Sequence, residues 1–234
     1  MFKYLILFYL FICAFTHKIV SIKPGGLKGF YMLGISKYLK ENYNTDDFTF
    51  YGSSAGSWNV LYLTLPIDNE IFFDGINLLT KKKYLSLYSL ENTVKIFLIN
   101  NFYDIPIQNN KKTNICLTKV NIFRKKKIII NEFDNLYQLI DCCIASSHIP
   151  FISNGNLFYM FNQSKYIDGG VFRNNYPNHI KPDLIISYKM FNNKKIYSCC
   201  ELNNLNVEKL VYEGYKDAKN NYKVFEDAFE DYEL

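Results

Sequence analysis

The sequence predicts an α/β fold with a mostly parallel sheet, because short β-branched segments alternate with segments of helical periodicity. The chain has 234 residues, a length typical of one domain. Since 49% of the residues are hydrophobic, one buried core can form without disulfides or a structural metal. No internal repeat or low-complexity linker divides the chain, so we expect one compact unit.

Each element is predicted from its local composition and periodicity. The segments expected to be strands are rich in β-branched and aromatic residues: 18–23, 48–51, 115–130 as a hairpin around 124–127, 157–160, 164–167, 184–188 and 195–199. The segments expected to be helices carry apolar residues at helical spacing: 27–42, 57–65, 67–110 with a basic break at 81–83, 135–145 and a long helix from 207. Strands and helices therefore alternate through most of the chain.

The charge balance argues against a nucleic-acid partner. The net charge is +5, from 27 basic and 22 acidic residues, and only Arg124 and Arg173 are arginines. Proteins that bind nucleic acid usually carry a dense basic stripe with arginines that contact phosphates and base edges. We therefore expect no binding to nucleic acid.

The first sixteen residues are strongly apolar, with Lys3 followed by twelve apolar residues. A membrane-spanning helix needs about 20 apolar residues, so this run is too short to cross a bilayer. It fits the basic start and apolar centre of a secretory signal peptide. We expect 1–16 to be a signal peptide, or alternatively an apolar N-terminal segment, before a domain at 17–234. The expected localisation is the secretory pathway, secretion or peripheral attachment to a membrane, with the cytoplasm as the alternative.

Six cysteines are present, at positions 13, 116, 142, 143, 199 and 200. Neither vicinal pair has the spacing of zinc ligands, which are separated by two or more residues, so we expect no metal site. Buried or half-buried free thiols are the simplest interpretation. A disulfide between the 142/143 pair and the 199/200 pair is the alternative.

The most specific local pattern is the pentapeptide Gly52–Gly56 (GSSAG), which lies between an expected strand and an expected helix. In G-x-S-x-G the serine occupies a sharp strand-to-helix turn, and the glycines allow the backbone to bend that tightly. The helix dipole and free N–H groups there favour a negatively charged acyl-transfer intermediate. Ser54 is therefore the candidate nucleophile, with Ser53 and Ala55 beside it. A turn without catalytic function is the alternative.

A second glycine-rich turn, Pro24–Gly29 (PGGLKG), also joins an expected strand to an expected helix. Free N–H groups at a helix start can bind an oxyanion or a phosphate. The dinucleotide fingerprint G-x-G-x-x-G would need glycine in place of Pro24. It would also need an acidic residue at the end of the second strand, whereas Asp46 and Asp47 precede that strand. Nucleotide binding is therefore the weaker hypothesis.

The segment Tyr166–Gly170 (YIDGG) places Asp168 where the chain leaves an expected strand. An aspartate in an ordinary turn is the alternative. A serine nucleophile needs a base, and His179 follows Asp168 in the order common among hydrolases. However, His179 lies in a loop with no local sign of that role. His148, in Ser146–Pro150, is more plausible as a site-lining or structural residue.

Together these motifs resemble those of the patatin-like phospholipases, which have a glycine-rich loop, G-x-S-x-G about 25 residues later, and D-G-G far downstream. The matching segments in this chain are Pro24–Gly29, Gly52–Gly56 and Asp168–Gly170, with further similarity at Ala145–Pro150, Asn175–Pro177 and Gly214–Ala218. The resemblance covers about residues 18–222. Three motifs in the right order are far more specific than any one of them.

The resemblance implies a three-layer α/β/α sandwich and a lipid acyl hydrolase, phospholipase A-like, that needs no metal or cofactor. Ser54 would attack the ester carbonyl and Asp168 would accept its proton, without a histidine. The N–H groups of Gly25 and Gly26 would form the oxyanion hole. The other residues expected to line the site are Lys28, Ser53, Ala55, Gly169 and His148.

Pro24 is one departure from the family pattern, which has glycine there. Proline has no N–H to donate, although the two positions of the oxyanion donors remain glycine. A catalytically inactive, lipid-binding member of the family is therefore the main alternative. The expected partner is a lipid ester at a membrane or micelle surface. The basic segments 81–83 and 124–127 could contact anionic headgroups, at about 1 kcal/mol for each charge, although solvated surface positions are the simpler interpretation.

Overall fold

The computed structural model describes residues 18–80, 86–107, 112–121, 124–199 and 201–229. The expected signal peptide at 1–16 and the basic segment 81–83 lie outside these residues, so both stay predictions. None of the described helices combines the length and the apolar character that a membrane span requires.

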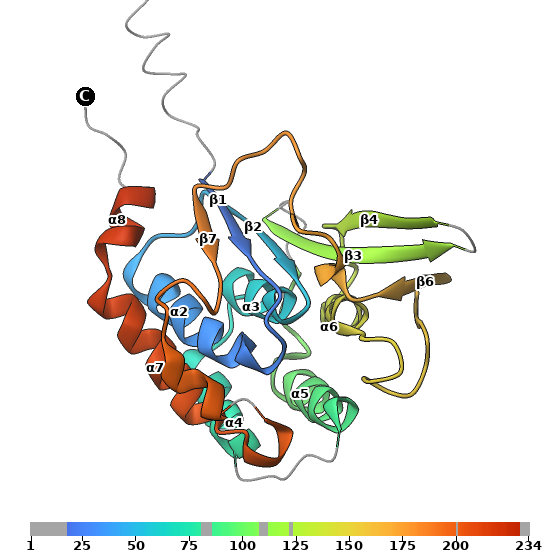
Figure 1. Cartoon of the computed structure of the whole chain (residues 1–234), viewed down its shortest axis with the longest axis horizontal. Helices are drawn as coiled ribbons and strands as arrows, with labels where there is room; N and C mark the ends of the chain where they lie inside the picture. The colour runs from blue at the N-terminus through green and yellow to red at the C-terminus, as the bar shows by residue number, and fades with distance from the viewer. Residues whose placement is uncertain (1–17, 81–85, 108–111, 122–123, 200, 230–234) are drawn as a thin grey trace, which may run out of the picture.

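Seven strands in the described part of the chain form one sheet (Figure 1). They are β1 (Lys18–Ile22), β2 (Phe48–Ser53), β3 (Thr113–Asn121), β4 (Arg124–Ile130), β5 (Tyr159–Phe161), β6 (Ser164–Ile167) and β7 (Leu184–Ile186). The order is β5-β6-β3-β2-β1-β7, with β4 also paired to β3. Strands β7, β1, β2 and β3 are parallel, whereas β4 and β6 run antiparallel to β3, and β5 antiparallel to β6.

The helices are arranged in layers beside this sheet (Figure 1). They are α2 (Gly29–Asn42), α3 (Ala55–Thr64), α4 (Asn69–Thr80), α5 (Leu87–Phe102), α6 (Leu136–Ser147), α7 (Val207–Asn220) and α8 (Lys223–Phe229). Helices α3 and α6 contact the strands directly, α2 packs on α3 and α7, and α4 contacts α5 and α7. The α/β class is confirmed, and the arrangement is consistent with a three-layer patatin-like fold.

Two local predictions are wrong. The segment expected to be a strand at 195–199 lies in a 3₁₀ helix, η3 (Lys194–Cys199), because the Asn193 side chain accepts a hydrogen bond from Lys195 N–H at 2.9 Å and starts a turn. The basic residues 124–127 lie in strand β4 instead of forming the hairpin turn. Strand β4 is an edge strand, where charged side chains reach solvent and discourage pairing with other chains.

The cysteine alternative is also wrong for the first vicinal pair. Cys142 and Cys143 are buried free thiols on α6, and Cys116 on β3 is a third. The Cys143 Sγ–H points to the carbonyl oxygen of Ser57 on α3, at 3.6 Å, so it faces the helix interface. Burial raises the pKa of Cys143 to about 12, which keeps this thiol protonated and unreactive.

Helices α2 and α7 cross so closely that their contact depends on two glycines. A Cβ atom at Gly214 would lie 1.9 Å from the Tyr31 carbonyl oxygen, and one at Gly34 would lie 2.0 Å from the Val211 carbonyl oxygen. The Tyr31 hydroxyl donates to Asp217 on α7 at 2.7 Å, which fixes the crossing further. Gly214 therefore serves the packing of α7 on α2.

We expect Gly214→Ala to lower the free energy of unfolding by about 1–3 kcal/mol, because the added methyl group forces the two helices apart. Urea-induced unfolding measures the change. Lys219→Ala, at an exposed position of the same helix, is the matched control and should change it by less than about 0.5 kcal/mol. Equal stabilities of the two variants would contradict the tight crossing.

Candidate active site

The two candidate catalytic residues meet because two strands end on the same edge of β3. At Cys116, β3 pairs with β4 on one edge and with the last residue of β2 on the other. At Thr118, it pairs with β4 again and with the last residue of β6. Strand β2 is parallel to β3 and β6 is antiparallel, so their carboxyl ends face each other across Leu117. The next residues in the chain, Ser54 and Asp168, therefore lie at one gap in the sheet.

Ser54 occupies a strained turn between β2 and α3. Its backbone angles are φ 53° and ψ −127°, in a region that residues with a side chain rarely adopt. The Ser54 N–H donates to Ser146 Oγ at 2.9 Å, and Ser146 Oγ donates to the Cys116 carbonyl oxygen at 2.7 Å. The Ser57 hydroxyl donates to the Ser54 carbonyl oxygen at 2.6 Å. These bonds hold the turn from both sides.

The two glycines of the GSSAG motif are required by close backbone approaches. A Cβ atom at Gly52 would lie 2.4 Å from the Gly56 carbonyl oxygen. A Cβ atom at Gly56 would lie 2.3 Å from the carbonyl oxygen of Ile22, the last residue of β1. The motif therefore packs α3 against the ends of β1 and β2, as the sequence predicts for this type of turn.

Asp168 is the N-cap of the short 3₁₀ helix η2 (Gly169–Val171), and its backbone N–H and carbonyl oxygen both form hydrogen bonds. Its N–H donates to the His148 carbonyl oxygen at 2.7 Å, and its carbonyl oxygen accepts from Thr118 Oγ1 at 2.9 Å. Its carboxylate accepts from the Gly170 N–H at 2.5 Å. Burial raises the pKa of Asp168, and hydrogen bonding with the side chain of Ser54 and with Gly170 partly opposes this.

The residues next to the dyad are also tightly packed. A Cβ atom at Gly169 would lie 2.0 Å from the Cys116 carbonyl oxygen and 3.0 Å from the Ser53 Cβ, so only glycine fits there. Ser53 is fully buried, and its hydroxyl has no hydrogen-bond partner among the described residues. Ser53 and Gly169 therefore lie in contact range, one beside each candidate catalytic residue.

The glycine-rich loop after β1 lies beside the Ser54 turn because β1 and β2 are neighbours in the sheet. Gly26 has φ +54° and begins the 3₁₀ helix η1 (Gly26–Lys28). Within the described part of the chain, the N–H groups of Gly25 and Gly26 have no hydrogen-bond partner. A Cβ atom at Gly29 would lie 2.6 Å from the Ala55 Cβ, so the loop packs on the start of α3.

The other predicted site residues have different surroundings. The Lys28 ammonium lies over the rings of Tyr188 and Tyr197, at 5.0 and 5.1 Å from their centroids, and Lys28 does not line the cavity described below. His148 is buried, and its Nε2 lies 3.1 Å from the Asn156 carbonyl oxygen. Burial lowers the pKa of His148, which keeps the ring neutral. His179 is exposed in its loop.

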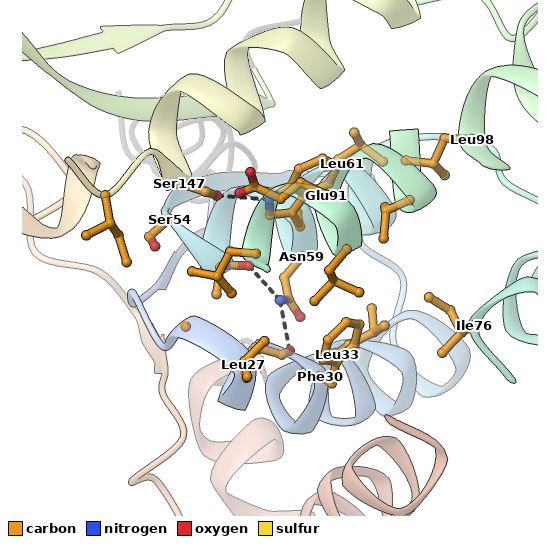
Figure 2. A pocket seen from close by; sticks show the side chains of 18 of the residues that line it. Leu27, Phe30, Leu33, Ser54, Asn59, Leu61, Ile76, Glu91, Leu98 and Ser147 are labelled. Atoms are coloured by element: carbon orange, nitrogen blue, oxygen red, sulfur yellow. Dashed lines mark hydrogen bonds between the residues drawn. The ribbon is translucent and has the colours of Figure 1, made fainter. Parts of the chain in front are cut away.

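A cavity of about 130 Å³ extends from Ser54 into the helical layer (Figure 2). Ser54 lies at one end, and Ile76 of α4 and Leu98 of α5 lie at the other. Most of the side chains that line it are apolar: Leu27, Phe30, Leu33, Ala55, Trp58, Leu61, Phe72, Ile76, Leu87, Leu90, Val94, Leu98 and Ile149. Such a cavity suits a hydrocarbon chain.

Two further polar side chains that line the cavity, those of Asn59 and Ser147, form hydrogen bonds within the protein. Asn59 Nδ2 donates to the carbonyl oxygens of Gly29 and Ala55, and Ser147 Oγ accepts from Trp58 Nε1 at 2.9 Å (Figure 2). Glu91 of α5 also lines the cavity. Burial, with a smaller contribution from the charge of Asp168, raises the pKa of Glu91 to about 8.

Sequence reasoning missed the supporting roles of Ser146 and Thr118 and the placement of Glu91. Glu91 lies in an ordinary helical segment, and only the packing of α5 on α6 and α4 brings it to the cavity. Ser146 stands in a segment that resembles the family, but its sequence context gives no sign of the bond to Ser54. In the described residues, no group of three or more His, Cys, Asp or Glu side chains could hold a metal ion.

We expect Ser54→Gly to be more stable than Ser54→Ala by about 1 kcal/mol, because glycine adopts positive φ without strain. Thermal and urea unfolding of the two variants measure the difference. Both lack the hydroxyl, so a difference between them reports the backbone alone. Equal stabilities would mean that the turn is not strained.

Glu91 predicts a dependence of stability on pH. Its pKa is about 8 in the folded protein and 4.5 when unperturbed, so the folded state binds more protons between these values. The contribution of Glu91 to stability therefore falls as the pH rises from 4.5 to about 8.

We expect Glu91→Gln to remove this part of the pH dependence, so its advantage in melting temperature over the parent chain should grow towards alkaline pH. Glu201→Gln, at an exposed carboxylate, is the control and should follow the parent at every pH. A Glu91→Gln curve parallel to that of the parent would contradict the burial of Glu91.

Comparison with known proteins identifies a family. The family model described as patatin-like phospholipase matches residues 20–180, more than half of the chain, including all three motifs. Among solved structures, the chain is similar to VipD from Legionella pneumophila, with 15% sequence identity and a TM-score of 0.37. That match covers 69% of this chain and 47% of VipD, so the aligned part spans about half of VipD. No curated protein gives a significant match.

The matched residues 20–180 make up more than half of the chain, which is enough to assign the family. The chain belongs to the patatin-like phospholipase family, a family of lipid acyl hydrolases.

Proposed function

We propose that this protein hydrolyses carboxylic esters of lipids in the manner of a phospholipase A, with Ser54 as nucleophile and Asp168 as general base. The observation that carries the proposal is the meeting of a strained serine and a buried carboxyl group at the end of an apolar cavity. A nucleophile, a base and a place for an acyl chain are thus present together. The family assignment supports the same reaction class.

In the first step, Ser54 Oγ attacks the ester carbonyl carbon and its proton passes to the Asp168 carboxylate. The carbonyl oxygen becomes an oxyanion, and the free N–H groups of Gly25 and Gly26 are its proposed donors. The tetrahedral intermediate then collapses, and the bond to the alcohol oxygen breaks. The alcohol leaves with the proton from Asp168, and the acyl group remains bound to Ser54.

In the second step, a water molecule attacks the acyl carbonyl and gives its proton to Asp168. Collapse of the second intermediate breaks the bond to Ser54 Oγ, which recovers the proton. A fatty acid is released and both residues return to their starting states. The reaction consumes one water molecule and needs no metal or cofactor.

The raised pKa of Asp168 favours its role as a base. A carboxylate in water is a weak acceptor for a serine proton, and burial strengthens it by disfavouring its charged form. Hydrogen bonds from Gly170 and the Ser54 side chain still favour the ionised form, so the group stays available to accept a proton. Neither described histidine is an alternative base, because His148 Nε2 faces Asn156 and His179 is exposed.

The cavity accounts for a preference for lipid esters. Its lining is apolar from Ser54 to the far end between α4 and α5. Each methylene group that moves from water into such surroundings contributes about 0.8 kcal/mol. An acyl chain bound there would point its ester carbonyl back towards Ser54, while the headgroup and alcohol side stay outside. We expect the lipid to be taken from a membrane or micelle surface.

We expect a fluorophosphonate probe to label the protein, and Ser54→Ala to abolish both the labelling and the release of fatty acid from mixed phospholipid vesicles. Asp168→Asn should lower the rate of release by about 10²- to 10⁴-fold, since it removes the general base. His179→Ala, at an exposed residue, is the matched control and should leave the rate unchanged.

Each departure from this result has a separate meaning. Loss of turnover in His179→Ala with turnover retained in Asp168→Asn would show that the dyad is wrong. Labelling without release of fatty acid would retain the serine hydrolase and discard phospholipid as the substrate. Folded protein that gives neither would favour the inactive, lipid-binding alternative, and binding of mononucleotides without labelling would favour the nucleotide-binding one.

A further inference from the structure

The segment between α6 and β5 carries several large apolar side chains that face solvent. In this segment Phe151, Ile152 and Leu157 are 66%, 64% and 44% exposed, and Met160 of the adjoining strand β5 is 56% exposed. Scattered apolar residues are common on protein surfaces, but a cluster of this kind in one short segment marks an interaction site. We call residues 150–158 the apolar loop.

The apolar loop is held in one conformation by hydrogen bonds at both ends. The Phe151 N–H donates to the Asn156 carbonyl oxygen at 2.9 Å, which closes the loop. The Ile149 N–H donates to Ser153 Oγ at 3.0 Å, and the Ile152 N–H donates to the Ile149 carbonyl oxygen at 3.1 Å. Ser153, within the loop, is itself buried. Phe151 and Ile152 therefore project from an ordered support.

Phe151 adopts a conformation that is unfavourable for its residue type. Its φ is +64°, in the left-handed region that glycine and asparagine occupy far more readily than an aromatic residue. No burial of the side chain compensates for this strain within the protein, because the ring is exposed. A strained and exposed aromatic side chain is better explained by a contact made outside the chain than by folding.

The charge around the apolar loop fits an anionic surface. Residues 142–167 contain no aspartate or glutamate. Lys165, which pairs with Met160 across the β5–β6 hairpin, has its ammonium 5.5 Å from the centroid of the Phe158 ring. The residues Arg124, Lys125 and Lys126 of β4 are exposed, and Lys126 pairs with Lys119 of β3, which pairs with Tyr166 of β6. Lys165 thus lies beside the apolar side chains, and the basic residues of β4 lie on the same sheet, with β3 and β6 between β4 and β5.

The apolar loop is directly connected to the candidate active site. Ile149, which precedes the loop, lines the cavity that begins at Ser54. The neighbouring His148 carbonyl oxygen accepts the hydrogen bond from the Asp168 N–H. A surface that held the loop would therefore lie beside the end of the cavity that Ser54 lines.

We propose that the apolar loop inserts Phe151 and Ile152 into the surface of membranes that contain anionic phospholipid, with the basic residues of β4 and Lys165 contacting the headgroups. The inserted loop brings the Ser54 end of the cavity to the lipid. The transfer of lipid to Ser54 rests on the proposed function, whereas the binding of the membrane does not. The two are therefore measured separately.

Binding is measured with the full chain carrying Ser54→Ala, so that turnover does not alter the vesicles. Sedimentation with vesicles of phosphatidylcholine and phosphatidylserine is compared with sedimentation with phosphatidylcholine alone. We expect stronger binding to the anionic vesicles, and weaker binding at high salt, because salt screens exposed charges. The double substitution Phe151→Asn and Ile152→Ser should weaken binding to anionic vesicles at least tenfold.

The substitutions are chosen to leave the loop folded. Asparagine tolerates positive φ better than phenylalanine, so Phe151→Asn relieves strain, and thermal unfolding verifies that stability is retained. Tyr212→Ser is the matched control, because Tyr212 is 61% exposed but lies on α7, away from the loop. It should bind vesicles as the parent does.

Activity provides the second measurement, with Ser54 intact. We expect the double variant to hydrolyse phospholipid in anionic vesicles at least tenfold more slowly, while a water-soluble short-chain ester is hydrolysed within twofold of the parent rate. Vesicle binding unchanged by the double substitution would overturn the proposal, and so would an equal loss on both substrates. If no ester is hydrolysed, the proposed function fails, and the binding experiment still decides the role of the loop.

Discussion

The pairing of β3 with two strands on one edge is the constraint on which the site depends. Strand β4 occupies one edge of β3, so β2 and β6 share the other edge and their last residues face each other. The last residue of β2 pairs with Cys116 and the last residue of β6 pairs with Thr118, so only Leu117 separates the two positions on β3. Strand β3 also supplies hydrogen-bond partners that hold both candidate catalytic residues in place. The Cys116 carbonyl oxygen accepts from the Ser146 hydroxyl that holds Ser54, and the Thr118 hydroxyl holds Asp168. A shift of either strand by one residue would separate the two candidate catalytic groups.

Several features of this gap are unfavourable for stability when taken alone. Ser54 has a strained backbone, Asp168 is a desolvated carboxyl group, and Ser53 has a buried hydroxyl without a partner among the described residues. Each costs on the order of 1–3 kcal/mol, and they persist because packed neighbours leave no alternative. Helices α3 and α6 supply that packing from the buried side of the sheet. Departures from local preference that gather in one place are typical of functional sites.

The parts of the site that the sequence predicts are those encoded by residues close together in the chain. Gly52 is needed within its own turn, since a Cβ atom there would collide with the Gly56 carbonyl oxygen. The GSSAG and DGG segments are short enough to be recognised as patterns, although the close approach of Gly169 is to Cys116 of β3. The hydrogen bond between Ser146 and the Ser54 N–H depends on how α6 packs, and the position of Glu91 at the cavity depends on how α5 packs. No local sequence pattern therefore encodes either feature. The wrong prediction of a strand at 195–199 has a related cause. The composition of this segment is typical of a strand, whereas the hydrogen bond from the Lys195 N–H to the Asn193 side chain starts a 3₁₀ helix.

Pro24 is the departure from the family pattern that first suggests an inactive protein, and its position in the structure argues for an intact site. A Cβ atom at Gly170 would lie 2.9 Å from the Pro24 Cβ, so the proline ring packs against the residue whose N–H holds the Asp168 carboxylate. The loss of one N–H at position 24 leaves the N–H groups of Gly25 and Gly26 without internal partners in the described chain. Pro24 therefore packs beside Gly170, which positions Asp168, while the two expected oxyanion donors keep N–H groups without a partner in the described residues.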